Sequence, residues 1–329
     1  MSKNNMVCAG IDTGKRKLDV AVRGVADERE QLQVDNTESG HEVLTAWLRQ
    51  HRVERVGIEA TGGYEQAIVS HLREQGFVVV VFQPIQVRAY ATFQGQLAKN
   101  DKIDAALIAE CTAAATKIHA PADPRLRPLA QQMTLIEQIV EDIARFKTRR
   151  ESCRDKQIQQ YWKEEITRLE RRKKAELKAL AAAIRKHQDL GKRLELIESV
   201  DGIGLITAVA ILVRLPEIGG VTREKIAALA GVAPYDNESG DQVGERHIRG
   251  GRGRLRKSLF CAALPASFRW NSHLIALYRR LKAAGKSHKI MLIACVRKLL
   301  IFVNTVVARG TPWQKQQPRV RAELGPQAT

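Results

Sequence analysis

The sequence predicts an α/β protein with three parts: an N-terminal domain on a mixed β-sheet, a connector of long paired helices, and a mainly helical C-terminal domain. Three observations predict it. Strand-like and helix-like segments alternate over residues 6–120, apolar residues step four and three apart after Pro128, and helical spacing dominates residues 191–310. These patterns are typical of a sheet covered by helices, of a coiled coil and of packed helices.

The N-terminal sheet is expected to begin with three meandering strands and to continue with strands that alternate with helices. Predicted strands cover residues 7–12, 18–22, 31–34, 53–58 and 77–82, and predicted helices cover residues 42–49, 64–75 and 102–115. The last strand, FVVVVF, is apolar enough to be buried on both faces. This order predicts a mixed sheet with helices packed on it.

The connector is predicted to be a coiled coil. Its seam is formed by Leu129, Met133, Ile136, Val140 and Ile143, and resumes at Leu177, Leu180 and Ile184. Between residues 145 and 178 there are thirteen Lys or Arg against six Asp or Glu, and we expect the chain to turn there. We favour a solvated face for this charge over a basic strut that touches nucleic acid. The predicted parts are residues 1–125, 126–190 and 191–310, with a loose tail at 311–329.

Composition narrows the class of partner. The 329 residues carry a net charge of +18, so a polyanion is the first partner to test, although an anionic membrane would also attract this charge. The apolar stretch 290–308 contains Arg297 and Lys298, which predicts a packed helix rather than a membrane span. No signal peptide is recognisable, and five widely spaced cysteines fit a reducing cytoplasm.

Four carboxylates are candidates for a metal site. Asp12 and Glu59 each close a predicted strand, and Asp101 and Asp104 share one face at the start of a predicted helix. Converging carboxylates are the ligands that Mg²⁺ prefers, and two such ions can assist a phosphoryl displacement. Each residue also has an ordinary role open to it, as a helix cap, a dipole partner or a turn former. Their shared placement at element ends favours the metal site.

Two glycine-containing segments in the C-terminal part are candidate phosphate contacts. Gly202 and Gly204 lie between two helical segments, as in a helix-hairpin-helix turn, although a tight turn between helices is equally compatible. Residues 234–253 form a polar loop that contains Ser239. Around and after it stand the basic residues Arg246, Arg249, Arg252, Arg254, Arg256 and Lys257. A serine can attack a phosphodiester when it is activated, and arginines clamp phosphates, but most serines before glycine simply form turns.

Five stretches together resemble one known family. They are GIDTGKRKLDV (10–20), IEATGGYE (58–65), KNDKIDA (99–105), SVDGIGLITA (199–208) and GVAPYDNESGDQVGERHIRGGRGRLRKSLF (231–260), in this order along nearly the whole chain. The sequence resembles the insertion-sequence transposases with a DEDD-type RuvC-like domain and a serine-bearing transposase domain. That family is related to the Piv-type pilin-gene DNA invertases, and its members are guided by a bridge RNA.

The resemblance implies an RNase H-like, RuvC-like N-terminal fold. It implies that Asp12, Glu59, Asp101 and Asp104 hold Mg²⁺, or another divalent ion such as Mn²⁺, and that Ser239 forms a covalent 5′-phosphoserine bond. It further implies DNA and a bridge RNA as partners and a homotetramer with sites completed across protomers. Two alternatives stay open: a RuvC-like junction endonuclease that uses metal-activated water, and a non-catalytic nucleic-acid scaffold.

Overall fold

The computed structural model describes residues 6–23, 29–95, 101–116, 123–235, 238–239, 242–243 and 246–314, and side chains are described throughout except at residues 29, 101–103, 238–239 and 242–243. The chain divides into two compact units, residues 1–121 and 122–329. Each unit is built around its own apolar cores, and the two are described separately below.

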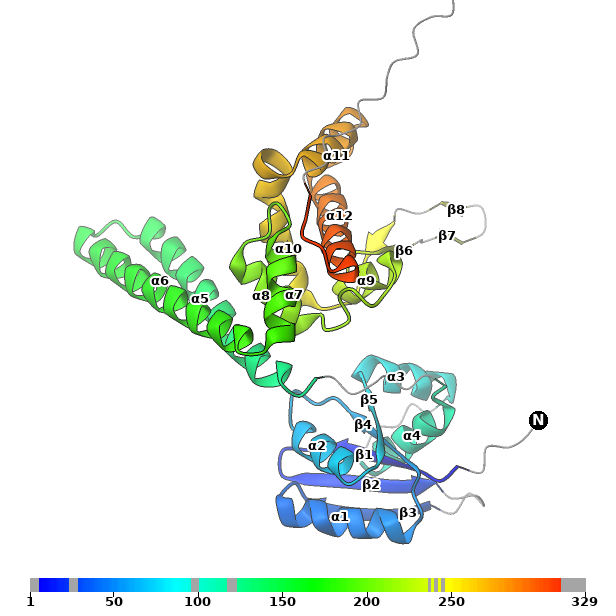
Figure 1. Ribbon diagram of the computed structural model, residues 1–329. Helices are drawn as coiled ribbons and strands as arrows, with labels where there is room; N and C mark the ends of the chain where they lie inside the picture. Colours follow the sequence, from blue (N-terminus) through cyan, green and yellow to red (C-terminus); the bar gives the residue numbers. More distant parts are fainter. Residues whose placement is uncertain are drawn as a thin grey trace, which may run out of the picture. The chain divides into compact units, whose positions relative to one another are not determined.

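The N-terminal unit contains a five-stranded mixed sheet in the order β3-β2-β1-β4-β5 (Figure 1). Strands β1 (Cys8–Thr13), β2 (Lys17–Arg23) and β3 (Arg29–Asp35) form an antiparallel meander. Strands β4 (Arg55–Glu59) and β5 (Val78–Phe82) add to β1 in parallel. This confirms the mixed sheet and the five strands predicted from the sequence.

Four described helices cover the two faces of this sheet. Helices α1 (Glu38–Gln50) and α2 (Gln66–Glu74) pack on the face that presents Ile11, Val20 and Ile58. Helix α4 (Asp101–Ala114), with α3 (Pro84–Phe93), packs on the face that presents Val80 and Phe82. Helix α3 was not predicted from the sequence. Strand β5 is buried on both faces, as predicted, through Val79 on one face and through Val80 and Phe82 on the other. Because β5 is an edge strand, Val78 and Val81 are 44% and 37% exposed.

The C-terminal unit begins with two long helices packed side by side, α5 (Leu126–Ser152) and α6 (Lys156–Arg185). The chain turns at residues 153–155, inside the charged segment where a turn was expected, and the Asp155 side chain caps α6. One position of the predicted seam was wrong. Val140 is 36% exposed, whereas Ile139 is 5% exposed and packs with Ile143, because an α-helix drifts relative to a strict heptad repeat.

The rest of this unit is a helical bundle. It contains α7 (Gln188–Glu198), α8 (Leu205–Arg214), α9 (Arg223–Ala230), α10 (Gly253–Pro265), a π-helix (Ala266–Trp270), α11 (Ser272–Ala283) and α12 (His288–Arg309). Helix α12 has the length and composition of a membrane span, but half of its apolar window is buried within the unit. Leu299, Leu300 and Val303 on α12 are completely buried, in the manner of a core helix.

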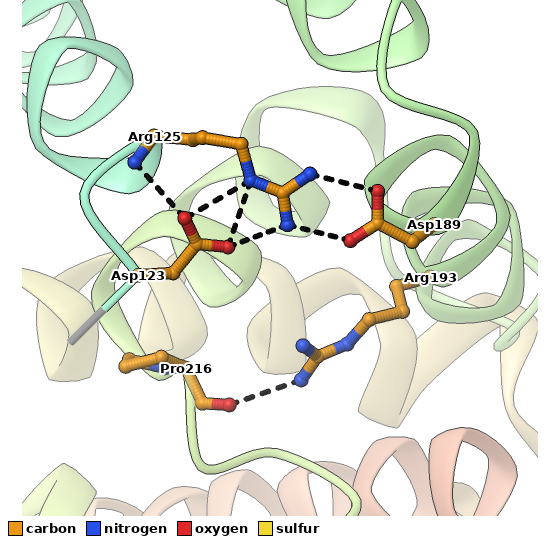
Figure 2. Close-up of polar contacts among 5 residues, drawn as sticks. All are labelled: Asp123, Arg125, Asp189, Arg193 and Pro216. Atoms are coloured by element: carbon orange, nitrogen blue, oxygen red, sulfur yellow. Dashed lines mark hydrogen bonds and ion pairs between the residues drawn. The ribbon is translucent and has the colours of Figure 1, made fainter. Parts of the chain in front are cut away.

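An ion-pair cluster fastens the start of α5 to α7 (Figure 2). The Arg125 guanidinium donates to both carboxylate oxygens of Asp123 and to both of Asp189, at 2.7–3.1 Å. The hydrogen bonds from Arg125 lower the pKa of Asp189 to about 2, so this exposed carboxylate is charged at neutral pH. Beside it, Arg193 donates to the carbonyl of Pro216 at 3.0 Å. The helix pair α5–α6 is therefore joined to the helical bundle by polar contacts as well as by its apolar core.

Candidate functional site

The sheet carries two carboxylates at one edge because of its strand register. Strands β1 and β4 are parallel neighbours in which Gly10 pairs with Gly57 and Ile11 pairs with Ile58. Asp12 and Glu59 are the next residues on the two strands and are half-buried. Since side chains alternate along a strand, Asp12 lies on the same face as Gly10 and Glu59 on the same face as Gly57. The fold therefore places Asp12 and Glu59 on the same face of the sheet, at corresponding positions of two neighbouring strands.

The two paired glycines seat α4 directly against that face. A Cβ at Gly10 would overlap the backbone of Ala105 and Ala109, and a Cβ at Gly57 would overlap Thr112. Helix α4 therefore crosses β1 and β4 at van der Waals distance from their backbones, which only glycine permits. Asp104, half-buried, immediately precedes Ala105, and Asp101 is the first residue of α4. The start of α4 thus lies over the face on which Asp12 stands.

These placements determine which of the four predicted carboxylates can be assessed as ligands of a metal ion. The structure describes the side chains of Asp12, Glu59 and Asp104, each of which has an interaction partner, while the side chain of Asp101 lies outside the described residues. Among the described residues, no group of three or more His, Cys, Asp or Glu is placed to hold a metal ion. The donor chemistry of the set fits a hard divalent cation, because all four members offer carboxylate oxygens.

The structure places a further carboxylate, that of Asp19, opposite Asp12. The two residues are cross-strand partners on β2 and β1, so they share a face. The Asp19 carboxylate accepts a 2.7 Å hydrogen bond from Gln33, whose amide oxygen in turn accepts one from Lys17 at 2.8 Å. The alternation of Asp19 with the apolar residues Leu18 and Val20, which are buried on the other face, is the sequence signal for this orientation.

The loop after β4 is held in shape by Glu65, which is only 9% exposed. Its carboxylate accepts hydrogen bonds from the backbone N–H groups of Thr61 and Gly63, at 3.1 and 2.9 Å. These bonds fix the turn that follows Glu59 directly. Glu65 therefore positions the carboxyl end of β4. This role was not predicted from the sequence, although Glu65 ends the stretch IEATGGYE that carries part of the family resemblance.

We expect substitution of Gly10 by alanine to destabilise the N-terminal unit. The added Cβ must push α4 away from β1, and overpacking of this kind costs about 1–3 kcal/mol of unfolding free energy. Urea unfolding followed by circular dichroism measures the loss. Gly253→Ala is the matched control, since a Cβ there meets no atom within 4 Å, and it should unfold like the unmodified protein. Equal stability of the two variants would contradict the close packing of α4 on Gly10.

The segment that contains Ser239 forms two short antiparallel strand pairs, one nested inside the other along the chain. Strand β6 (Pro234–Tyr235) pairs with β9 (His247–Ile248), and β7 (Glu238–Ser239) pairs with β8 (Gln242–Val243). The backbone of Ser239 pairs with that of Gln242, so Ser239 ends the inner strand of a hairpin. Its side chain lies outside the described residues. The sequence predicted only a polar loop over residues 234–253, without these strands.

The six basic residues predicted to contact phosphate, between residues 246 and 257, have interaction partners within the chain. Arg252 forms two hydrogen bonds of 2.6–2.7 Å with Glu217, Arg254 contacts Glu137 at 3.0 Å, and Lys257 contacts Glu141 at 2.9 Å. Arg256 donates to the carbonyls of Gly231 and Gly250, and the guanidinium of Arg249 lies 5.4 Å from the ring centre of Tyr235. Arg246 is exposed and also has an interaction partner. These contacts hold the start of α10 against α5 and the neighbouring turns.

The glycine turn at 201–204 joins α7 to α8. Gly202 has φ +100°, and a Cβ there would overlap the Ala266 side chain, so glycine is required for packing against the π-helix. Gly204 is the N-cap of α8 and is exposed, with open space where a Cβ would project. The packing explains Gly202 without a phosphate, whereas a nucleic-acid contact at Gly204 stays a prediction.

Comparisons with known proteins agree on one class. A family model described as "Transposase", of the DEDD type, matches residues 9–156, and a second described as "Transposase IS116/IS110/IS902 family" matches residues 194–279. The chain is similar to the pilin gene-inverting proteins of Moraxella bovis, at 27% identity over 93% of this chain and 97% of the relative, and of Moraxella lacunata, at 26% with the same coverage.

Two further similarities cover parts of the chain. An uncharacterised 43.6 kDa protein of insertion element IS110 from Streptomyces coelicolor is 28% identical over 37% of this chain and 30% of its own length. A solved structure of Thermus thermophilus RuvC is 23% identical, with a TM-score of 0.24, over 36% of this chain and 86% of that chain. The two transposase models together match more than half of the 329 residues. The protein is an enzyme of the transposase and site-specific recombinase class, and it belongs to the IS116/IS110/IS902 family of transposases.

Proposed function

We propose that this transposase is an RNA-guided DNA recombinase that cuts and exchanges strands through a covalent 5′-phosphoserine at Ser239. The observation that carries the proposal is the register of β1 and β4, which sets Asp12 beside Glu59 under the start of α4. Guidance by a bridge RNA and assembly as a tetramer rest on the family resemblance. Asp12, Glu59, Asp101 and Asp104 are the proposed ligands of Mg²⁺, which when bound would neutralise charge on the scissile phosphate.

The proposed chemistry conserves the energy of the phosphodiester. The Ser239 hydroxyl oxygen bonds to the phosphorus, the bond from phosphorus to the 3′ oxygen breaks, and the proton that the serine loses is balanced by the one that the 3′ oxygen gains. A 3′-hydroxyl of another strand then attacks the phosphoserine, which restores the serine hydroxyl and makes a new phosphodiester. The two steps form as many bonds as they break, so no nucleotide triphosphate is consumed. Serine needs activation for this step because its free hydroxyl is a weak nucleophile.

The proposal is tested by reconstitution. The purified protein, its co-purified RNA, matched donor and target DNA and Mg²⁺ are incubated together, and recombinant junctions are scored by sequencing. A suicide substrate with a nick near the cleavage point is used in parallel to trap a protein–DNA adduct. We expect junctions and a serine-linked adduct, both dependent on RNA and Mg²⁺. Cleaved DNA without an adduct would instead establish the metal-dependent junction endonuclease.

A further inference from the structure

A segment in the last quarter of the sequence carries a net positive charge as large as that of the whole protein. Between residues 246 and 322 the sequence contains no Asp and no Glu, while eighteen Lys or Arg fall there, a number equal to the net charge of +18. Several of these cations form ion pairs with Glu137 and Glu141 on α5 or with Glu217, as described above. Six others are exposed on the π-helix, on α11, in the turn between α11 and α12, and at the start of α12: Arg269, Arg279, Arg280, Lys282, Lys286 and Lys289.

Two exposed aromatic residues flank Arg269 on the π-helix, which packs against α11. Phe268 and Trp270, on the π-helix, are 48% and 58% exposed. The Phe268 ring packs against two neighbouring rings. Its centroid lies 4.8 Å from that of Tyr278, in an edge-on arrangement, and 6.5 Å from that of His288. The Tyr278 hydroxyl is hydrogen-bonded to His288 at 2.7 Å. We call Phe268, Arg269, Trp270, Arg279, Arg280 and Lys282 the aromatic–basic face.

The backbone under this face is anchored from several directions. Ser267 is buried and donates to the Ala263 carbonyl at 2.7 Å, and the buried Asn271 caps α11 and donates to the Asp201 carbonyl at 3.0 Å. Ala266 packs against Gly202. The π-helix therefore rests on the turn between α7 and α8, and it presents three consecutive residues, 268–270, to solvent. Single-turn π-helices are frequent at functional sites.

We infer that the aromatic–basic face binds unpaired nucleotides of a polynucleotide. Exposed aromatic rings stack on bases of any sequence, and cations beside them neutralise the phosphates of the same strand. A protein partner is disfavoured because the four exposed cations of this face, in a segment without any carboxylate, favour a polyanion opposite them. A duplex is disfavoured because its bases are already stacked on one another. The inference rests on the proposed function, since it locates where that enzyme holds single-stranded DNA or RNA.

Binding is measured by fluorescence anisotropy with three labelled probes: a 20-nucleotide oligothymidylate, a 20-nucleotide oligouridylate and a 20-base-pair duplex. We expect Trp270→Ala to weaken binding of the single strands about tenfold, the effect of losing one base stack, and to leave the duplex unchanged. Trp270→Phe should restore most of the affinity. Tyr161→Ala is the matched control, because Tyr161 is equally exposed (56%) but lies on α6, and it should bind like the unmodified protein. Comparison of the two single strands shows whether DNA or RNA is preferred.

The charged members of the face are tested by salt. Replacing Arg279, Arg280 and Lys282 together by glutamine should lower the slope of log affinity against log salt by about two for single strands. Unchanged single-strand affinity in Trp270→Ala, or equal losses for duplex and single strand, would overturn the inference. So would a change of oligomeric mass caused by Trp270→Ala without nucleic acid, which would assign the face to a second copy of the chain. Adducts formed by the variants are scored separately, so a failure of phosphoserine chemistry leaves this binding result intact.

Discussion

Replacement of Ser239 by alanine is expected to abolish the covalent protein–DNA adduct and to slow strand exchange by at least about 10³-fold, the scale on which removal of a nucleophile acts. The hydroxyl oxygen is the atom that bonds to phosphorus in the proposed reaction, and alanine has no substitute for it. The adduct is measured on a nicked suicide substrate by gel electrophoresis after denaturation, and the linkage is located by mass spectrometry of the digested protein.

Ser152→Ala is the matched control. Ser152 is exposed at the end of α5, and its hydroxyl donates to the carbonyl of Arg149 at 3.1 Å. This variant should form adduct and junctions at the rate of the unmodified protein. Both variants should bind DNA normally, which separates a chemical defect from a binding defect. Normal cleavage by Ser239→Ala would refute the phosphoserine step and leave the junction endonuclease as the function.

Asp12→Asn and Glu59→Gln are each expected to reduce cleavage at least about 100-fold. A bound divalent ion is worth several kcal/mol of charge stabilisation in phosphoryl transfer, and each amide removes one anionic ligand while keeping the side chain's shape. Because both strands continue into the same edge of the sheet under α4, the two variants should have similar effects. The measurement is the cleavage rate as a function of Mg²⁺ concentration, with a thermal shift on Mg²⁺ addition as a second readout.

Glu54→Gln provides the matched control for this pair. Glu54 is an exposed carboxylate just before the start of β4, at the opposite end of the strand that Glu59 closes. Its replacement should leave both the cleavage rate and the Mg²⁺-dependent thermal shift unchanged. Wild-type cleavage by Asp12→Asn would refute the carboxylate site, and a thermal shift that persists in both Asp12→Asn and Glu59→Gln would place the cation elsewhere.

Local patterns were sufficient for much of the architecture. The mixed sheet, the turn in the charged middle of the long helices and the packed state of α12 follow from alternation, from apolar spacing and from the position of Arg297 and Lys298. Differences occurred where position in the fold outweighed composition. Within FVVVVF, Val79, Val80 and Phe82 are buried, but Val78 and Val81 are partly exposed because β5 is the edge strand of the described sheet. Near residue 140, a small helical drift buries Ile139 in place of Val140.

The sequence by itself determined the class of the protein, because five stretches in a fixed order carry the family resemblance, while the charge excess of +18 made a polyanion the first partner to test. Tertiary structure alone decided which charges are available. From the sequence alone, we predicted phosphate contacts for Arg252, Arg254 and Lys257. In the folded chain these side chains instead contact Glu217, Glu137 and Glu141, which come from distant parts of the sequence. Tertiary structure likewise decided that Asp12 adjoins Glu59, since strand register is a property of the sheet. Pairings of residues far apart in sequence depend on packing, which no local pattern encodes.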